Sequence, residues 1–320
     1  MWIEDYRPKK LADVLGQEVI IERLMAFAKD KGNMPHFLFA GPAGVGKTST
    51  AIALAREIFQ ESFAENYKEL NASDERGIKM VREDIKKYAS IMPAARMPFR
   101  LLVLDEADNM TSDAQQALRR TMEKYKSLRF ILIANYSSKI ISPIQSRCAV
   151  FRFRPIPKNL VKKKIAEITK NEGINIEEKA IDALCNVSEG DMRKLLNVMQ
   201  AASVLSSEIT EEVVHDVAGR AHPKKIDEML NILFTHSMDG FFEARKKLRS
   251  LLYSVGVSGK DLVKQIHTAI IDNTNIAETE KVTIIGILGE VDFRLTEGAN
   301  EEIQLVYLLA KIIDVMNKNT

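Results

Sequence analysis

The sequence predicts an α/β fold in which a parallel sheet domain precedes domains that are entirely helical. Short apolar runs in the first half, such as "HFLFA" (36–40), "RLLVLD" (100–105) and "RFILIAN" (129–135), alternate with helix-like segments. Strands that alternate with helices form parallel units, and their sheet is covered on both faces. After "FRPIP" (153–157) the strand pattern fades, and the rest of the chain has the pattern of amphipathic helices.

Two interruptions of this pattern predict three domains. The first lies at Pro157, where strands give way to helices. The second lies in "GRAHPKK" (219–225), where glycine, histidine and proline interrupt the helical pattern. The predicted domains are a sheet domain at 1–157 and helical domains at 158–221 and 222–320. The strands expected in the first domain are 36–40, 68–70, 100–105, 129–135 and 149–153.

The composition is that of an ordinary globular protein and excludes several other classes. Hydrophobic residues make up 46% and charged residues 28% of the 320 residues. The net charge is only +2, so any surface for nucleic acid has to be local. Cys148 and Cys185 are too few for a zinc site or a disulfide scaffold, and we interpret Cys148 as a buried thiol. Because no long apolar run and no signal peptide are present, we expect an intracellular protein without a membrane partner.

The stretch "GPAGVGKT" fits the phosphate-binding pattern G-x-x-x-x-G-K-[ST], and it lies between a strand pattern and a helix pattern. In such a loop backbone N–H groups point at phosphate oxygens, and glycines such as Gly44 and Gly46 allow a close approach. Lys47 brings positive charge to the β- and γ-phosphates, and the Thr48 hydroxyl binds Mg²⁺. The predicted nucleotide-binding residues here are Gly41, Pro42, Ala43, Gly44, Val45, Gly46, Lys47, Thr48 and Ser49.

A second motif, "LLVLDEAD", places two carboxylates at the end of a buried strand. We expect Asp105 to hold Mg²⁺ and Glu106 to polarise the attacking water, which is the minimum for nucleotide hydrolysis. Asn135 ends another core strand and points into the same crevice, where it could orient that water. The alternatives are helix-capping acids, which we consider weak, and an asparagine that only caps a turn.

Two arginines follow in motifs of their own. Arg147 lies in "SPIQSRC" before the last strand, and Arg193 lies in "GDMRKLL" at the start of a helix. A guanidinium placed on the γ-phosphate stabilises transition-state charge. Taken alone, each position is more typical of a surface arginine.

Together these motifs resemble the AAA+ clamp-loader ATPases, and more closely the archaeal-style small subunits of replication factor C. Further boxes agree with this resemblance: "WIEDYRPKKLADVLGQ" (2–17), "ELNASDERGI" (69–78) and "ALRRTME" (117–123). The likeness is specific from Trp2 to about Val198, and beyond that it rests on helical character and length. It implies a P-loop AAA+ sheet domain, a helical lid and a C-terminal helical collar.

The resemblance also implies roles for individual residues, with ATP and Mg²⁺ as cofactors. The segment from Tyr6 to Gly16, including Arg7 and Val14, wraps the adenine and ribose. Asn135 is the first sensor of the γ-phosphate, and Arg193 reaches the same nucleotide from the lid as the second. Arg147 is an arginine finger that acts in trans on the ATP of a neighbouring subunit.

The partners implied by the resemblance are the clamp-loader large subunit and further small subunits in a pentameric ring, the sliding clamp and primer-template DNA. The compartment is cytoplasmic in an archaeal or prokaryotic host and nuclear in a eukaryote. The loop "IMPAARMPF" (91–99) either faces the clamp or folds its apolar side chains inward, and the sequence favours neither reading.

A helix in "SDERGIKMVREDIKKYAS" (73–90) is the candidate DNA surface. Apolar residues at helical spacing, including Ile85 and Tyr88, predict a stripe that packs on the sheet. The basic residues beside it could be a solvated face balanced by acids, but the resemblance favours DNA, held through its phosphates without base readout. The predicted DNA-binding residues are Arg76, Lys79, Arg82, Lys86 and Gln115.

Gln115 is included because the next helix, 112–125, directly follows the catalytic acids. We predict a capping box of Ser112 and Gln115 at its start. A DNA contact there could release Glu106 into an active rotamer, which is our hypothesis for how DNA stimulates hydrolysis.

Three rival functions remain at this point. One is another AAA+ DNA motor, such as a junction helicase or a recombination-associated ATPase, which would carry a winged-helix domain. Another is a scaffold that binds ATP without hydrolysis, against which the intact catalytic residues argue. The last is a bacterial clamp-loader subunit, which usually has a zinc cluster of four cysteines.

Overall fold

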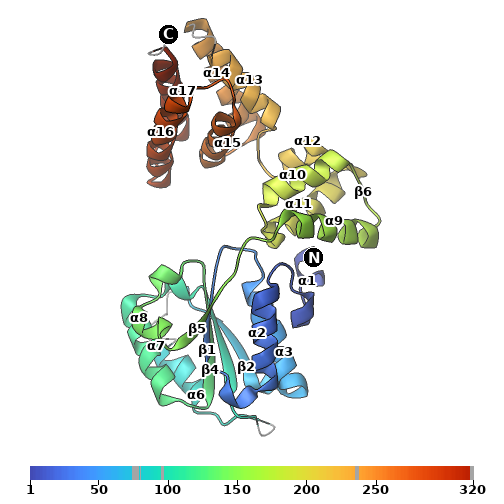
Figure 1. Ribbon diagram of the computed structural model, residues 1–320, viewed down its shortest axis with the longest axis vertical. Helices are drawn as coiled ribbons and strands as arrows, with labels where there is room; N and C mark the ends of the chain where they lie inside the picture. Colours follow the sequence, from blue (N-terminus) through green and yellow to red (C-terminus); the bar gives the residue numbers. More distant parts are fainter. Residues whose placement is uncertain (74–78, 80, 95–96, 235–237, 318–320) are drawn as a thin grey trace. The chain divides into compact units, whose positions relative to one another are not determined.

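The computed structural model describes residues 1–73, 79, 81–94, 97–234 and 238–317 (Figure 1). The chain forms two compact units, Met1–Gly173 with Cys185–Gln200, and Ile174–Leu184 with Ala201–Thr320. The domain boundaries expected near residues 157 and 221 stay predictions. Among the described residues, every helix falls short of the length and apolarity needed to span a bilayer.

The first unit is built on a five-stranded parallel sheet in the order β2-β3-β4-β1-β5. The strands are β1 His36–Ala40, β2 Tyr67–Asn71, β3 Arg100–Asp105, β4 Leu128–Ala134 and β5 Cys148–Arg152. All five lie where the apolar runs predict them. Parallel register aligns Ala40 with Ala134 and Asn71 with Asp105, so the carboxyl ends of the strands share one edge.

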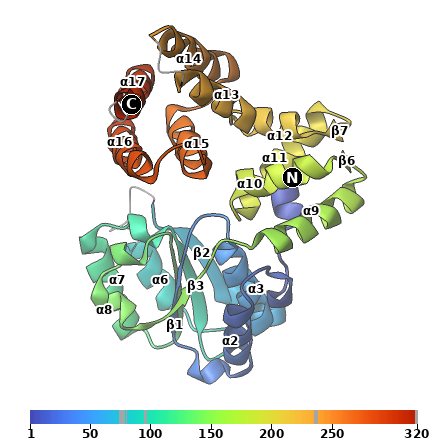
Figure 2. The same cartoon turned by 45° about the horizontal axis from the view of Figure 1, so that its top comes forward.

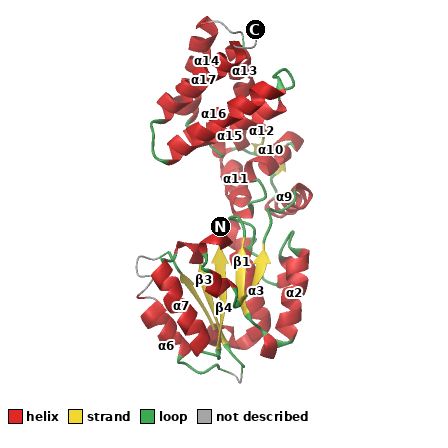
Figure 3. Cartoon of the chain, turned by 60° about the vertical axis from the view of Figure 1, so that its left-hand side comes forward, coloured by secondary structure: helices red, strands yellow, loops and turns green. Residues whose placement is uncertain are grey.

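Helices cover both faces of this sheet, as Figure 3 shows with α2 and α3 on one side and α6 and α7 on the other. Successive strand residues point to opposite faces, so Phe37 and Phe39 pack with α2 and α3, while Leu38 packs with α6 and α7. These helices are α2 Glu18–Lys29, α3 Lys47–Phe59, α6 Lys86–Ala89 and α7 Ser112–Lys124. The predicted doubly covered sheet is thereby confirmed.

Shorter helices and the first helices after the sheet complete the first unit. They are α1 Trp2–Asp5, α4 Phe63–Asn66, α8 Ser142–Gln145 and α9 Lys158–Glu172. Helices α10 Glu178–Ser188 and α11 Met192–Leu205 follow, and only their residues within Cys185–Gln200 belong to the first unit. Ile85 and Tyr88 are buried against the sheet, as the apolar stripe predicts.

The second unit is helical apart from a two-residue parallel pairing of β6 Asn175–Ile176 with β7 Glu208–Ile209. Its helices α13 to α17 lie side by side around one apolar core that includes Ile226, Ile266 and Leu308 (Figure 2). The helices are α12 Glu211–Val217, α13 Pro223–Leu233, α14 Met238–Ser250, α15 Gly259–Asp272, α16 Glu278–Thr296 and α17 Glu301–Asn317. The predicted all-helical C-terminal region is confirmed.

Candidate nucleotide site

The glycine-rich loop lies between β1 and α3 and ends at the amino terminus of that helix. Gly46 is the N-cap of α3 and has a left-handed backbone with φ of 94°, which glycine adopts without a steric cost. Gly44 also has a positive φ of 67°, and a Cβ built there would lie 1.6 Å from Asp191 Oδ1. The requirement for glycine at Gly44 therefore comes partly from a carboxylate of the chain itself, which the sequence pattern does not reveal.

Lys47 is held inside this loop by three acceptors. Its Nζ donates to Gly41 O at 2.7 Å, Pro42 O at 2.6 Å and Asn135 Oδ1 at 3.0 Å. Burial lowers the pKa of Lys47, and the nearby carboxylates of Asp105 and Asp108 act in the opposite direction. These contacts place a buried ammonium among the loop groups that line a phosphate site.

Thr48 and Asp105 form the candidate magnesium site. The Thr48 hydroxyl donates to Asp105 Oδ2 at 2.7 Å, so two oxygen donors lie side by side at the carboxyl edge of the sheet. Hydroxyl and carboxylate oxygens are the donors that Mg²⁺ prefers, and this ion completes its shell with water and phosphate oxygens. The donor set therefore fits Mg²⁺.

Glu106 follows in a backbone conformation that is unusual for a residue with a side chain. Its φ is 54°, and its N–H donates to Asp105 Oδ1 at 2.8 Å. Its carboxylate accepts from Asn109 Nδ2 at 3.3 Å and is exposed. Strained backbone of this kind persists where the surroundings impose it, often at functional sites. Glu106 is exposed and lines the candidate pocket together with Asp105.

Asp108 is a site residue that the sequence reasoning missed. It is buried, and its Oδ2 accepts from the backbone N–H groups of Asn135 and Tyr136, both at 3.1 Å. The signal was present in the quoted motif "LLVLDEAD", whose last carboxylate is Asp108. Its role is to fix the turn that carries Asn135, which in turn contacts Lys47.

A pocket of ≈ 270 Å³ gathers nearly all of the predicted nucleotide-binding residues. Tyr6, Arg7 and Val14 line it from the amino-terminal segment, and Arg193 lines it from α11. Asp105, Glu106, Asn135 and every loop residue from Ala43 to Ser49 line it as well. Gly41 and Pro42 take part only through the carbonyls that hold Lys47. The pocket also includes Ile3, Ile156, Lys164 and Leu196, which the motifs do not predict.

The turn before α11 connects this helix to the glycine-rich loop. Glu189 and Gly190 both have positive φ, 53° and 82°, and reverse the chain sharply. Met192 N then donates to Gly44 O at 3.0 Å, while Asp191 Oδ1 accepts from Lys194 N at 2.9 Å. The motif "GDMR" therefore docks on the loop, and Arg193 faces the pocket because its helix starts there.

Tyr6, which lines the pocket from the amino-terminal segment, is positioned by a contact with α9. Its hydroxyl donates to Glu172 Oε1 at 2.7 Å, which ties the amino-terminal segment to α9. Burial and the Glu172 carboxylate raise the pKa of Tyr6, so it stays a neutral donor. The apolar part of the pocket, made by Val14 and its neighbours, is suited to a planar base.

Arg147 lies elsewhere. Its guanidinium pairs with Glu123 and donates to Pro143 O at 2.6 Å. Arg147 is not one of the described residues that line the nucleotide pocket. Its proposed action on a neighbouring subunit stays a prediction.

The predicted DNA-binding residues have different outcomes. Lys79 is exposed, and so is Lys86 at the start of α6. Arg76 and the side chain of Arg82 lie outside the residues that the structure describes.

Gln115 does not have the surroundings of a direct DNA contact, because it is 3% exposed and fully occupied. Its Nε2 donates to Met110 O and Lys139 O, and its Oε1 accepts from Ile141 N at 2.9 Å. The expected capping box is also wrong, since the N-cap of α7 is Thr111, whose side chain accepts from Ala114 N. Gln115 instead links α7 to the segment after β4.

The loop at 91–99 combines both of its predicted alternatives. Ile91 and Met92 are 51% and 80% exposed, whereas Phe99 is buried in the core at 1%. Cys148 is only partly buried, so the prediction of a buried thiol is wrong; desolvation still raises the pKa of its thiol to about 12, in agreement with an unreactive cysteine.

Comparison with known proteins identifies both halves of the chain. Residues 37–156 match the family model "ATPase family associated with various cellular activities (AAA)", so the sheet unit carries an AAA ATPase domain. Residues 221–311 match the model "Replication factor C C-terminal domain".

Solved structures support the fold alone. The Thermotoga maritima RuvB Holliday junction branch migration motor has a TM-score of 0.54 and 18% identity, covering 79% of this chain and 86% of that one. At such low identity the similarity carries no information on function.

Curated relatives match over nearly their full lengths. The replication factor C small subunit of Thermofilum pendens is 48% identical, covering 99% of this chain and 98% of that protein. That of Archaeoglobus fulgidus is also 48% identical, with coverage of 99% and 98%. The motifs from the glycine-rich loop to "GDMR" and the comparisons agree, and the chain belongs to the replication factor C small subunit family.

Proposed function

We propose that this chain binds and hydrolyses ATP with Mg²⁺ and thereby drives the loading of a sliding clamp onto primer-template DNA, as a small subunit of a clamp loader. The observation that carries the proposal is the convergence of Lys47, the Thr48–Asp105 pair, Glu106 and Arg193 on one pocket. The names of the relatives support the assignment to a clamp loader.

In this proposal the groups of the pocket divide the work on the nucleotide. Lys47 lies 2.6 to 3.0 Å from three acceptors, which it exchanges for phosphate oxygens. Thr48 and Asp105 would hold Mg²⁺, whose charge neutralises phosphate oxygens. Glu106 accepts the proton of the attacking water, and Asn135 orients that water.

The turn at 189–193 offers a way for nucleotide to act on the helical part of the first unit. Arg193 and the loop contact of Met192 are only one residue apart in sequence. A γ-phosphate bound by Arg193 would therefore pull on the same turn that docks on Gly44. Hydrolysis would remove that attachment, which is the conformational output that a loader requires.

The remaining partners and boundaries belong to the same proposal. A pentameric ring with a large subunit and further small subunits lets Arg147 reach the ATP of a neighbour, once it leaves Glu123. DNA would be held by Lys79, Lys86 and the neighbouring arginines, and Ile91 and Met92 would face the clamp. We also propose domains at 1–157, 158–221 and 222–320, and a cytoplasmic location, because the similar relatives come from archaea.

The experiment is ATP turnover of the chain assembled with its large subunit, measured with and without primed DNA and clamp. Strong stimulation by both together supports the proposal. Lys47→Ala abolishes turnover, and Arg147→Ala lowers it. A mixture of the two variants recovers part of the activity if Arg147 serves a neighbour. Turnover that ignores the clamp would contradict clamp loading, and no recovery in the mixture would contradict action in trans.

A further inference from the structure

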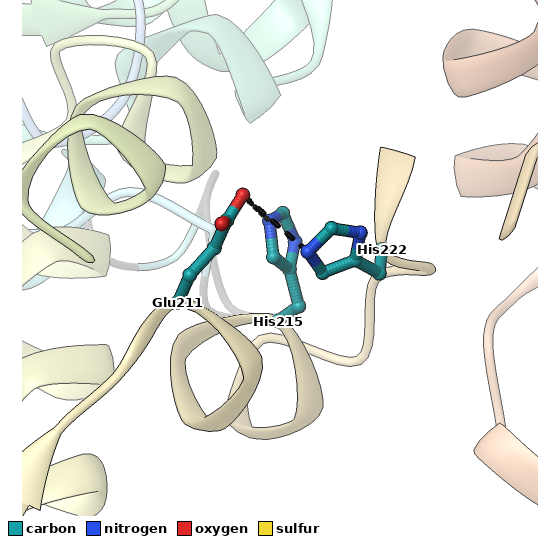
Figure 4. A group of neighbouring side chains, drawn as sticks. All are labelled: Glu211, His215 and His222. Carbon is teal, nitrogen blue, oxygen red and sulfur yellow. Dashed lines mark ion pairs between the residues drawn. The ribbon is translucent and has the colours of Figure 1, made fainter. Parts of the chain in front are cut away.

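Two side chains of the short helix α12 and one from the turn after it converge in a cluster that the nucleotide site does not use (Figure 4). Glu211 and His215 lie four residues apart on α12, and His222 is the N-cap of α13. Their donor atoms all lie within 4.8 Å of one another. Glu211 Oε1 is 3.4 Å from His222 Nε2 and 4.0 Å from His215 Nε2.

The surroundings of His215 are those of a ligand more than of a surface histidine. The residue is 6% exposed, and its Nδ1 has no hydrogen-bond partner among the described residues. The side chains of Glu211 and His222 are 32% and 20% exposed, so the cluster is reached from solvent.

We propose that Glu211, His215 and His222 bind one divalent transition-metal ion of the Zn²⁺ class. Two imidazoles and one carboxylate are a donor set that suits such ions, and it leaves further positions for water. A tetrahedral ion with bonds of about 2.0–2.1 Å holds its ligand atoms roughly 3.3 Å apart. The Glu211–His222 separation of 3.4 Å is close to this value, and His215 Nε2, 4.0 Å from Glu211 Oε1, has to move closer.

Binding requires one local rearrangement. His222 Nδ1 accepts from Lys224 N at 3.2 Å, so in the neutral ring the proton lies on Nε2, which faces Glu211. When the ion binds at Nε2, the hydrogen of the neutral His222 ring lies on Nδ1 instead. Nδ1 then no longer accepts from Lys224 N, and this exposed N–H donates to water instead.

The ion would connect α12 to the N-cap residue of α13. Only a short turn separates these helices, and it contains Gly219 with a φ of 60°. A bound metal would fix this turn, at the point where the replication factor C C-terminal domain match begins. The site therefore has a structural role, independent of ATP chemistry.

The test is a titration of the full chain, purified without a histidine tag and treated with chelator, in a buffer free of nucleotide and Mg²⁺. We expect one equivalent of Co²⁺ to bind with the visible absorption of a low-coordinate nitrogen and oxygen site. Zn²⁺ should displace it and raise the melting temperature. Glu211→Gln and His222→Gln should each weaken binding at least ~10-fold, as loss of a ligand requires.

Two controls separate this site from others. His267→Gln removes a histidine outside the cluster, and Asp105→Asn alters the oxygen pair of the nucleotide site; both should leave the Co²⁺ spectrum and affinity unchanged. If Glu211→Gln and His222→Gln bind Co²⁺ and Zn²⁺ as the wild type does, the proposal is overturned. Because both side chains are partly exposed, these variants fold even if His215→Ala does not.

Discussion

The Asp108 carboxylate accepts a hydrogen bond from the backbone N–H of Asn135 at 3.1 Å, across the carboxyl ends of β3 and β4. The same oxygen accepts from Tyr136 N, so the turn after β4 is fixed by a buried acid. Asn135 Oδ1 then accepts from Lys47 Nζ at 3.0 Å. Asp108 thus positions the side chain that we propose to orient water, without touching the nucleotide itself.

Replacement of this acid tests its positioning role. Asp108→Ala removes the shared acceptor of the Asn135 and Tyr136 N–H groups, whose hydrogen bonds are partly buried, so we expect a loss of about 0.5–1.5 kcal/mol in unfolding free energy for each bond. We expect ATP turnover to fall at least ~10-fold, because Asn135 and Lys47 lose their alignment. Asp108→Asn keeps an acceptor oxygen and should retain more activity. Equal turnover by Asp108→Ala and wild type would show that Asn135 needs no such support.

The strand ends could be predicted from sequence because apolar runs and their polar terminators are local signals. Asp105, Glu106 and Asn135 could be predicted in this way, whereas Lys47 and Thr48 were predicted from the phosphate-binding pattern. The surroundings of Gln115 were not, because a glutamine in a polar helix pattern looks exposed until the segment at 139–141 folds over it. The contact of Asp191 with Gly44 joins residues far apart in sequence, and only the fold reveals it.

Gln115→Ala should act first on stability. The substitution removes the hydrogen bonds that the buried Gln115 side chain donates to Met110 O and Lys139 O and accepts from Ile141 N, so we expect a loss of about 1–3 kcal/mol in unfolding free energy. Urea unfolding of the isolated chain measures this. Gln115→Glu is the matched variant of similar size, and it fails to donate to the two carbonyls. An unchanged midpoint in Gln115→Ala would mean that the buried network contributes nothing.

The exposed lysines should behave in the opposite way. Lys79→Ala and Lys86→Ala remove charges from a solvated face, so the melting temperature should stay within error. In the assembled loader, each should weaken binding to primed DNA and reduce its salt dependence by about one counterion. The control is Lys246→Ala, which replaces another exposed lysine, on α14.

A Gln115→Ala variant that weakens DNA binding without a change in stability would restore the original hypothesis that Gln115 contacts DNA.

His36 predicts a pH dependence of stability. Burial lowers its pKa from 6.5 to about 4, and its Nδ1 accepts from Phe130 N at 3.1 Å. Between these two values the unfolded chain binds the proton and the folded chain does not. The contribution of His36 to the unfolding free energy is therefore fully present above about pH 6.5. It decreases by roughly 2–3 kcal/mol as the pH falls toward 4. Urea unfolding at several pH values should show a smaller slope for His36→Gln than for wild type.

Gly44 and Asp191 allow a test of how α11 docks on the glycine-rich loop. A Cβ at residue 44 meets the Asp191 carboxylate at 1.6 Å, and its φ of 67° is unfavourable for a side chain. Gly44→Ala should therefore displace the turn at 189–193 and weaken ATP binding at least ~10-fold, by a cost of about 1–3 kcal/mol. Titration with a fluorescent ATP analogue measures the affinity.

The double variant separates the two causes. Asp191→Ala alone removes the clash partner and the acceptor of Lys194 N, and should weaken binding only modestly. If steric conflict dominates, adding Asp191→Ala to Gly44→Ala restores part of the lost affinity, because the new methyl group gains space. If backbone strain dominates, the double variant binds no better than Gly44→Ala. In that case the glycine is required by its φ, and the contact with Asp191 only follows from it.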